Sequence, residues 1–80
     1  MNIVTKNFWS LYVIAPNLKT GDRIELISMI DDPHPIEPGA TGTVQFVSEL
    51  VGFDQFQIAV KWDNGRDLLL VVPPDRYKKL

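Results

Sequence analysis

The sequence contains no cysteine among its 80 residues. Disulfide bonds, thiolate metal sites and cysteine nucleophiles are therefore excluded. Only one histidine, His34, is present, and a serine hydrolase triad would depend on it. No serine lies in a Gly-x-Ser-x-Gly turn, and no recognised spacing of metal ligands occurs. We therefore expect a protein that is not an enzyme and that holds no cofactor or metal.

The chain also has little net charge, because eight basic and ten acidic residues leave it at -2. A generic nucleic-acid-binding protein usually has a clear basic excess. No long hydrophobic run is present either. The apolar stretch 8–15 is far shorter than the roughly 20 residues that span a bilayer, and it lacks a signal-peptide cleavage pattern. We expect a single cytoplasmic domain with no membrane partner.

Short segments rich in β-branched and aromatic residues make up most of the chain, separated by glycine and proline. None has a sustained 3.6-residue period, so the pattern predicts an all-β fold. The expected strands cover residues 8–14, 23–29, 41–50, 55–62, 68–72 and 76–80. Residues 31–39 hold three of the six prolines and are expected to form an irregular loop. Gly39 and Gly42 are expected to supply the bend into the strand that follows.

Period-two alternation predicts which residues of each strand face the core. Inward residues are expected to be Ile24, Leu26 and Ile30 in one strand, Val44, Phe46 and Leu50 in the next, and Phe56, Ile58, Val60 and Trp62 in the third.

Asp63-Asn64-Gly65 joins two apolar runs and predicts a tight β-hairpin. A two-residue Asn-Gly loop would pair charged with apolar side chains. A three-residue loop instead pairs Val60 with Leu68, Ile58 with Leu70, and Lys61 with Asp67. Apolar side chains then lie opposite apolar ones, and the lysine lies opposite a residue of opposite charge. We therefore predict the three-residue loop, with Gly65 at positive φ in a bulge.

The order of strands, proline-rich loop, tight hairpin and final proline turn resembles that of a small five-stranded SH3-like barrel. The motifs also resemble the uncharacterised bacterial and phage family known as domain of unknown function 4314. They are Gly21-Asp22-Arg23-Ile24-Glu25-Leu26, Asp32-Pro33, Pro38-Gly39, Gly42-Thr43-Val44, Val60-Lys61-Trp62-Asp63-Asn64-Gly65 and Asp75-Arg76-Tyr77. This resemblance spans residues 21–80 and implies a phage or mobile-element setting. Residues 19–80 are then the barrel, and residues 1–18 are an extension that adds an N-terminal strand.

A non-catalytic module that binds a protein is the expected function, such as an accessory protein acting on a host protein. Acidic loop residues near Pro74 and Tyr77 imitate the acidic and aromatic lining that binds basic proline-rich segments. The N-terminal segment is apolar on both faces, so it needs a cover, which the barrel, a second copy in a homodimer, or a partner would supply. The predicted partner-binding residues are Asp31, Asp32, His34, Glu37 and Tyr77, with Trp9 and Tyr12 from the N-terminal segment.

A nucleic-acid-binding module is the alternative. It would use five basic residues near the hairpin and the C-terminus, although Asp63, Asp67 and Asp75 lie among them and reduce the positive field. These basic residues are Lys61, Arg66, Arg76, Lys78 and Lys79.

Overall fold

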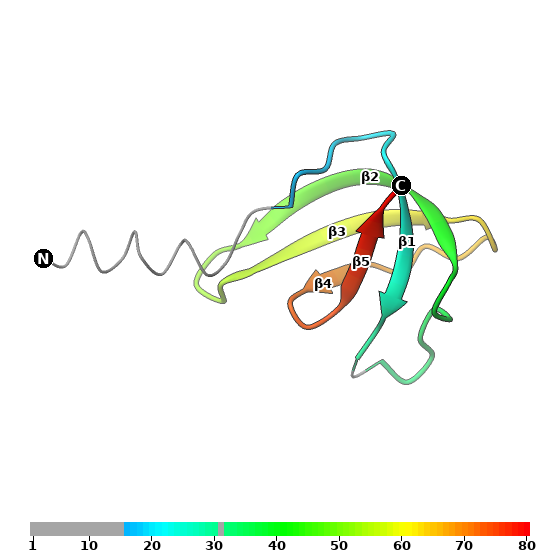
Figure 1. Cartoon of the computed structure of the whole chain (residues 1–80). Coiled ribbons are helices and arrows are strands. Elements are labelled where there is room, and N and C mark those ends of the chain that lie inside the picture. Colours follow the sequence, from blue (N-terminus) through cyan, green and yellow to red (C-terminus); the bar gives the residue numbers. More distant parts are fainter. Residues whose placement is uncertain (1–15, 31) are drawn as a thin grey trace, which may run out of the picture.

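The computed structural model describes residues 16–30 and 32–80, which form five antiparallel strands in one sheet. The strands are β1 (Arg23–Ser28), β2 (Thr41–Leu50), β3 (Gln55–Trp62), β4 (Leu70–Val72) and β5 (Arg76–Lys79). Their order across the sheet is β4-β3-β2-β1-β5 (Figure 1). The described residues contain no helix, so the all-β prediction is confirmed.

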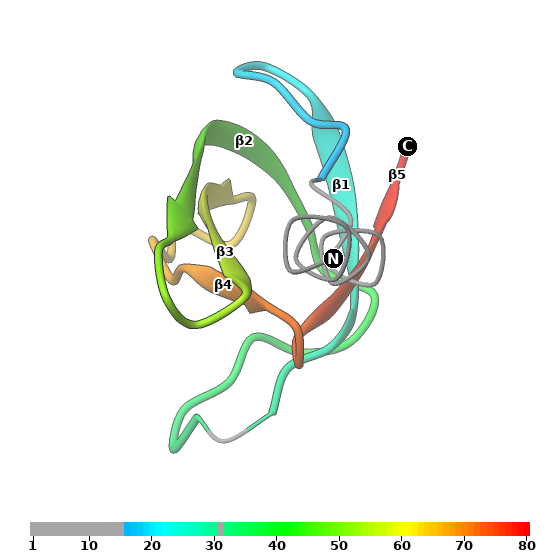
Figure 2. The same ribbon diagram turned by 90° about the vertical axis from the view of Figure 1, so that its left-hand side faces the viewer.

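The sheet curls but does not close. Its two edges are β4 and β5, which diverge from the short turn 73–75 that joins them (Figure 2). We call the opening between these two edge strands the seam. The expected N-terminal strand falls on residues 8–14, which lie outside the described residues.

The β3 strand was predicted to the residue, and its alternation places Ile58, Val60 and Trp62 in the core. Trp62 is 1% exposed, and its indole Nε1 donates a hydrogen bond of 2.8 Å to the backbone carbonyl of Leu68. Gly42 lies opposite Trp62 within β2, and a Cβ atom there would come within 2.6 Å of a Val60 methyl. Gly42 thus allows close packing and does not form a bend, whereas Gly39 has φ +91° and does form the turn.

The predicted hairpin register is confirmed. Gly65 has φ +93°, the backbone N–H of Trp62 donates to the carbonyl of Arg66 at 2.9 Å, and Ile58 lies opposite Leu70. The β4 strand is shorter than expected, since it begins at Leu70, and the ladder includes neither the predicted pair of Val60 and Leu68 nor that of Lys61 and Asp67. The Leu68 carbonyl instead accepts the indole N–H described above.

Two predictions of inward faces are wrong, and strand irregularities explain both. In β2, Val44 lies opposite Val60 but Phe46 lies opposite Ala59, so Gln45 is an extra residue in a bulge. The bulge reverses the faces beyond it and leaves Phe46 54% exposed. Leu50 lies four residues after Phe46 in the stretch beyond the bulge and opposite Gln55. Its side chain is therefore on the same side of the sheet as that of Phe46 and not on the side of Val44.

In β1, Ile24 and Leu26 are buried as predicted, but Ile30 is 48% exposed. The register of β1 against β5 shifts between Leu26 and Ser28, and the strand ends before Ile30. The side chain of Ile30 therefore no longer follows the alternation that buries the first half of the strand.

Candidate functional site

Asp75, in the turn between β4 and β5, links β4 to the end of β1. Its side chain is 6% exposed, and it is the one charged residue buried within the described part of the chain. One carboxylate oxygen accepts the backbone N–H of Ile30 at 2.9 Å, and the other accepts that of Val71 at 3.0 Å. The end of β1 and the strand β4 are thus held by one side chain. The sequence interpretation treated Asp75 only as a turn residue and a surface charge, and so missed this role.

Two hollows lie on the surface around Asp75. The first, which we call the Tyr77 groove, has a volume of about 450 Å³ and is lined by Ile27, Val72, Pro73, Pro74, Asp75, Arg76 and Tyr77. The second, the Asp32 hollow, has a volume of about 280 Å³ and is lined by Met29, Ile30, Asp32, Leu69, Val71, Pro74 and Asp75. Because Pro74 and Asp75 line both, the two hollows are neighbours with this turn between them.

The Tyr77 groove is largely apolar because aliphatic and proline side chains make up most of its lining. Ile27 follows the buried Leu26 in β1, so its side chain lies on the outer side of the strand, where it is 40% exposed. Tyr77 lies opposite Leu26 and packs against the core while it also lines the groove. Burial raises the pKa of the Tyr77 hydroxyl above its ordinary value, because the phenolate would be poorly solvated there. The groove therefore offers a neutral phenol beside aliphatic and proline surfaces.

The predicted partner-binding residues are brought together only in part. Asp32 and Tyr77 line the two neighbouring hollows. His34 and Glu37 are exposed and line neither hollow. Asp32 accepts the backbone N–H of His34 at 2.8 Å, which is a local turn contact. The remaining predicted residues, Asp31, Trp9 and Tyr12, lie outside the described residues.

The long loop 32–39 is anchored to the sheet by Ile36, which is 1% exposed in the core cluster. Its backbone N–H points to the sulfur of Met29 at 3.4 Å. Arg66, from the hairpin, donates a hydrogen bond of 3.2 Å to the carbonyl of Pro35. The loop that carries Asp32 is therefore held both by packing of Ile36 in the core and by the hydrogen bond from Arg66 of the hairpin.

The basic residues proposed for nucleic acid are spread over several surfaces. Lys61 lies opposite Thr43, and Lys78 lies opposite Glu25, both on the outer face of the sheet. Lys79 points elsewhere, because its ammonium lies 3.5 Å from the Asp22 carboxylate and donates to a nearby carbonyl. Arg66 contacts the long loop, and Arg76 lines the Tyr77 groove.

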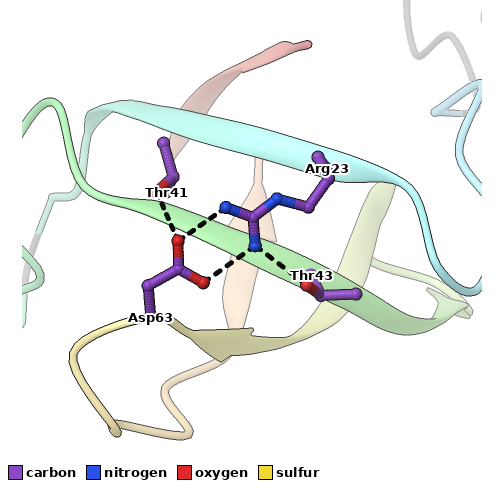
Figure 3. Close-up of polar contacts among 4 residues, drawn as sticks. All are labelled: Arg23, Thr41, Thr43 and Asp63. Carbon is purple, nitrogen blue, oxygen red and sulfur yellow. Dashed lines mark hydrogen bonds and ion pairs between the residues drawn. The ribbon is translucent and has the colours of Figure 1, made fainter.

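A polar cluster on the outer face joins the hairpin to β1 and β2 (Figure 3). Both terminal nitrogens of Arg23 donate to the Asp63 carboxylate, at 2.8 and 2.6 Å. Thr41 donates to the same carboxylate at 2.6 Å, and Arg23 also donates to Thr43 at 3.0 Å. The hydrogen bonds from Arg23 and Thr41 hold the pKa of the Asp63 carboxyl well below its usual range. The side chains of Arg23 and Asp63 are about half exposed. Because the carboxylate of Asp63 binds side chains of β1 and β2, the cluster supports the hairpin.

No group of three His, Asp or Glu side chains among residues 16–30 and 32–80 could hold a metal ion. The same residues include no helix long and apolar enough to cross a membrane.

A comparison with protein-family models matches residues 10–80 to DUF4314, described as a domain of unknown function. The chain belongs to the DUF4314 family. The match begins eleven residues before Gly21, where the motifs that carry the resemblance begin. No match was found among curated proteins or among solved structures.

Proposed function

We propose that this DUF4314 protein is a non-catalytic module that binds an extended segment of a partner protein across the Tyr77 groove and the Asp32 hollow. The observation that carries the proposal is that the two hollows meet at Pro74 and Asp75. One is largely apolar and the other holds a carboxylate, so a single peptide crossing the turn would contact both.

The chemistry of the lining defines the class of ligand. Proline and aliphatic side chains of an extended peptide suit the surface formed by Tyr77, Pro73 and Val72. A basic side chain suits Asp32 at the other end of the site. Arg76 lines the groove and disfavours a basic residue there. The two charges therefore favour one orientation of the ligand, with its basic end at Asp32.

An SH3-like barrel is the fold class that we propose for this sheet. Five antiparallel strands in the order β4-β3-β2-β1-β5 support it, as do the long loop after β1 and the short turn before β5. The proposed setting is the cytoplasm, in a phage or mobile element. The phage or mobile-element setting rests on the family resemblance.

The test is peptide binding to the full chain by fluorescence anisotropy. The probe is a fluorescein-labelled peptide of alternating proline and leucine that ends in an arginine pair. Asp32→Asn should weaken binding about two- to fivefold, since an ion pair at a partly exposed site contributes about 0.5–1 kcal/mol. The matched control is Asp54→Asn, at the exposed turn between β2 and β3, where φ is +53° and asparagine is tolerated.

The proposal requires that the arginine peptide binds and that only Asp32→Asn weakens it. Equal affinities for the two variants, or no binding by the wild type, would overturn it. A single-stranded DNA oligonucleotide at low salt serves as a second probe. Binding of the oligonucleotide without binding of the peptide would favour the alternative, in which Lys61 and Lys78 on the outer face contact phosphate.

A further inference from the structure

The two edge strands of the sheet differ in whether their backbone groups are already bonded. At the β4 edge, the N–H of Val71 donates to the Asp75 carboxylate at 3.0 Å, and the carbonyl of Val71 accepts the Asp75 N–H at 2.9 Å. The turn after β4 therefore covers the middle of this short edge. Among residues 16–30 and 32–80, β5 pairs with β1 on one side and with no strand on the other (Figure 2). The open edge of the sheet is therefore that of β5.

The register of β5 shows which of its backbone groups face this open edge. The N–H of Leu80 donates to the carbonyl of Arg23 at 2.9 Å, so this antiparallel pair is hydrogen-bonded. Hydrogen-bonded and non-hydrogen-bonded pairs alternate along an antiparallel ladder. The backbone of Lys78 therefore also faces β1, whereas Tyr77 and Lys79 direct their N–H and C=O groups away from it. These two residues offer donors and acceptors to an added strand.

The side chains on the outer side of this edge are positively charged. Period-two alternation puts Arg76 and Lys78 on the same face, and both are exposed. Lys78 lies opposite Glu25, and Arg76 lies opposite Ser28. No ion pair within the described part of the chain includes either cation. The edge of β5 therefore presents two positive charges without a bound carboxylate.

These charges disfavour a second copy of the chain at the edge. In a twofold pair of antiparallel β5 strands, the residues with outward backbone groups must lie opposite one another. With Tyr77 opposite Tyr77, Arg76 lies opposite Lys78. With Tyr77 opposite Lys79, the two copies of Lys78 lie opposite each other, and the remaining register opposes the two copies of Lys79. Directly opposed like charges destabilise a strand pair, so the edge favours a strand of negative charge.

We propose that the free edge of β5 binds an extended segment of a partner protein in which acidic and apolar residues alternate. The added strand runs antiparallel to β5 and places its acidic residues opposite Arg76 and Lys78. An apolar residue lies opposite Tyr77, which packs against the core cluster. Lys78 then lies between Glu25 and a carboxylate of the partner, a cross-strand arrangement that stabilises a sheet. The inference does not rest on the proposed function, whose ligand is basic.

The probe is a fluorescein-labelled peptide of alternating glutamate and valine, and fluorescence anisotropy measures its binding to the full chain. In the proposed register the valine N–H groups face β5 and the glutamate N–H groups face away. An N-methyl group on the central valine should therefore weaken binding about tenfold, because it removes a backbone hydrogen bond and leaves the charge unchanged. The matched control is an N-methyl group on the neighbouring glutamate, which should leave the affinity within about twofold.

A variant tests the charge of the edge. Lys78→Glu should weaken binding of the unmethylated peptide about three- to tenfold, because an attractive cross-strand pair becomes a repulsive one. Lys61→Glu is the matched control. It makes the same charge change at an exposed position on the outer face of β3, with β2 and β1 between it and β5, and should leave the affinity nearly unchanged.

Several outcomes would overturn the proposal. Equal losses in Lys78→Glu and Lys61→Glu would show a general attraction of polyanions, and equal affinities of the two N-methyl peptides would show that no strand is added. Absence of binding by the wild type would also refute it. So would a wild-type dimer in sedimentation equilibrium that the peptide dissociates, since a second copy would then occupy the edge. The arginine peptide and Asp32→Asn are measured separately, so either proposal can fail while the other stands.

Discussion

Replacing Asp75 should destabilise the fold more than replacing any other carboxylate in the described residues. Its two oxygens accept the backbone N–H groups of Ile30 and Val71, both partly buried. A hydrogen bond to a charged group contributes about 1.5–3 kcal/mol, and an orphaned donor adds a desolvation cost. Asp75→Ala should therefore lower the free energy of unfolding by about 3–5 kcal/mol. A domain of this size has about 4–12 kcal/mol in total, so the variant lies close to unfolding.

Asp75→Asn is the more informative variant because it keeps the shape and one acceptor. Its amide NH₂ group would face one of the two backbone N–H groups, so we expect a loss of about 1.5–3 kcal/mol. The assay is urea unfolding followed by tryptophan fluorescence. With an m-value of about 1 kcal/mol/M, the midpoint should fall by about 1.5–3 M.

Asp67→Asn is the matched control, because this aspartate is exposed in the segment between the hairpin and β4. Its midpoint should stay within about 0.5 M of the wild type, as is usual for surface substitutions. If Asp75→Asn and Asp67→Asn unfold at the same urea concentration, the two backbone hydrogen bonds do not stabilise the fold and the reasoning fails.

Two further predictions concern the scaffold. Gly42→Ala places a Cβ 2.6 Å from a Val60 methyl and 2.9 Å from the carbonyl of Lys61, so overpacking should cost about 1–3 kcal/mol, seen as a lower Tm in thermal unfolding. For Asp63, hydrogen bonds from Arg23 and Thr41 depress the pKa in the folded state. Its stabilisation is then complete above the unfolded pKa of about 3.9 and is lost as pH falls toward the folded value. The stability difference between wild type and Asp63→Asn should therefore shrink from pH 6 to pH 2, and a constant difference would contradict this account.

Local patterns in the sequence were sufficient where structure depends on neighbours along the chain. The alternation of residues 55–62 predicted β3, and the requirement for matched faces predicted the three-residue hairpin with Gly65 at positive φ. Both depend on period-two geometry and turn conformation, which act over a few residues. The same reasoning placed Trp62 in the core.

The bulge at Gln45 shows why the same alternation failed in β2. Residues 41–50 give only a weak sign of the bulge, because Val47 is apolar at an odd position and Ser48 is polar at an even one, while Phe46 and Leu50 keep the even pattern. The bulge follows from the pairing of β2 with β3, where Val44 meets Val60 but Phe46 meets Ala59. That pairing depends on how the sheet curls, and the curl cannot be predicted from the sequence of either strand alone.

The candidate site depends still more on distant parts of the chain. Asp75 follows two prolines, so the sequence indicated a turn, yet its partner Ile30 lies 45 positions away. Asp63 was expected to offset nearby positive charges, but its ion pair is with Arg23, 40 positions earlier. Such contacts arise only after β1, β4 and the hairpin have come together, so composition and spacing contain no trace of them.

The dependence of the site on Asp75 links stability to binding in this fold. Ile30 and Val71, whose N–H groups the carboxylate holds, both line the Asp32 hollow, and Asp75 itself lines both hollows. Loosening this contact would let the end of β1 and the strand β4 move apart at the point where the two hollows meet. No ladder resists that separation, because β1 and β4 are not neighbours in the sheet. One buried carboxylate therefore links β4 to the end of β1, while it leaves the seam between β4 and β5 open for an extended segment.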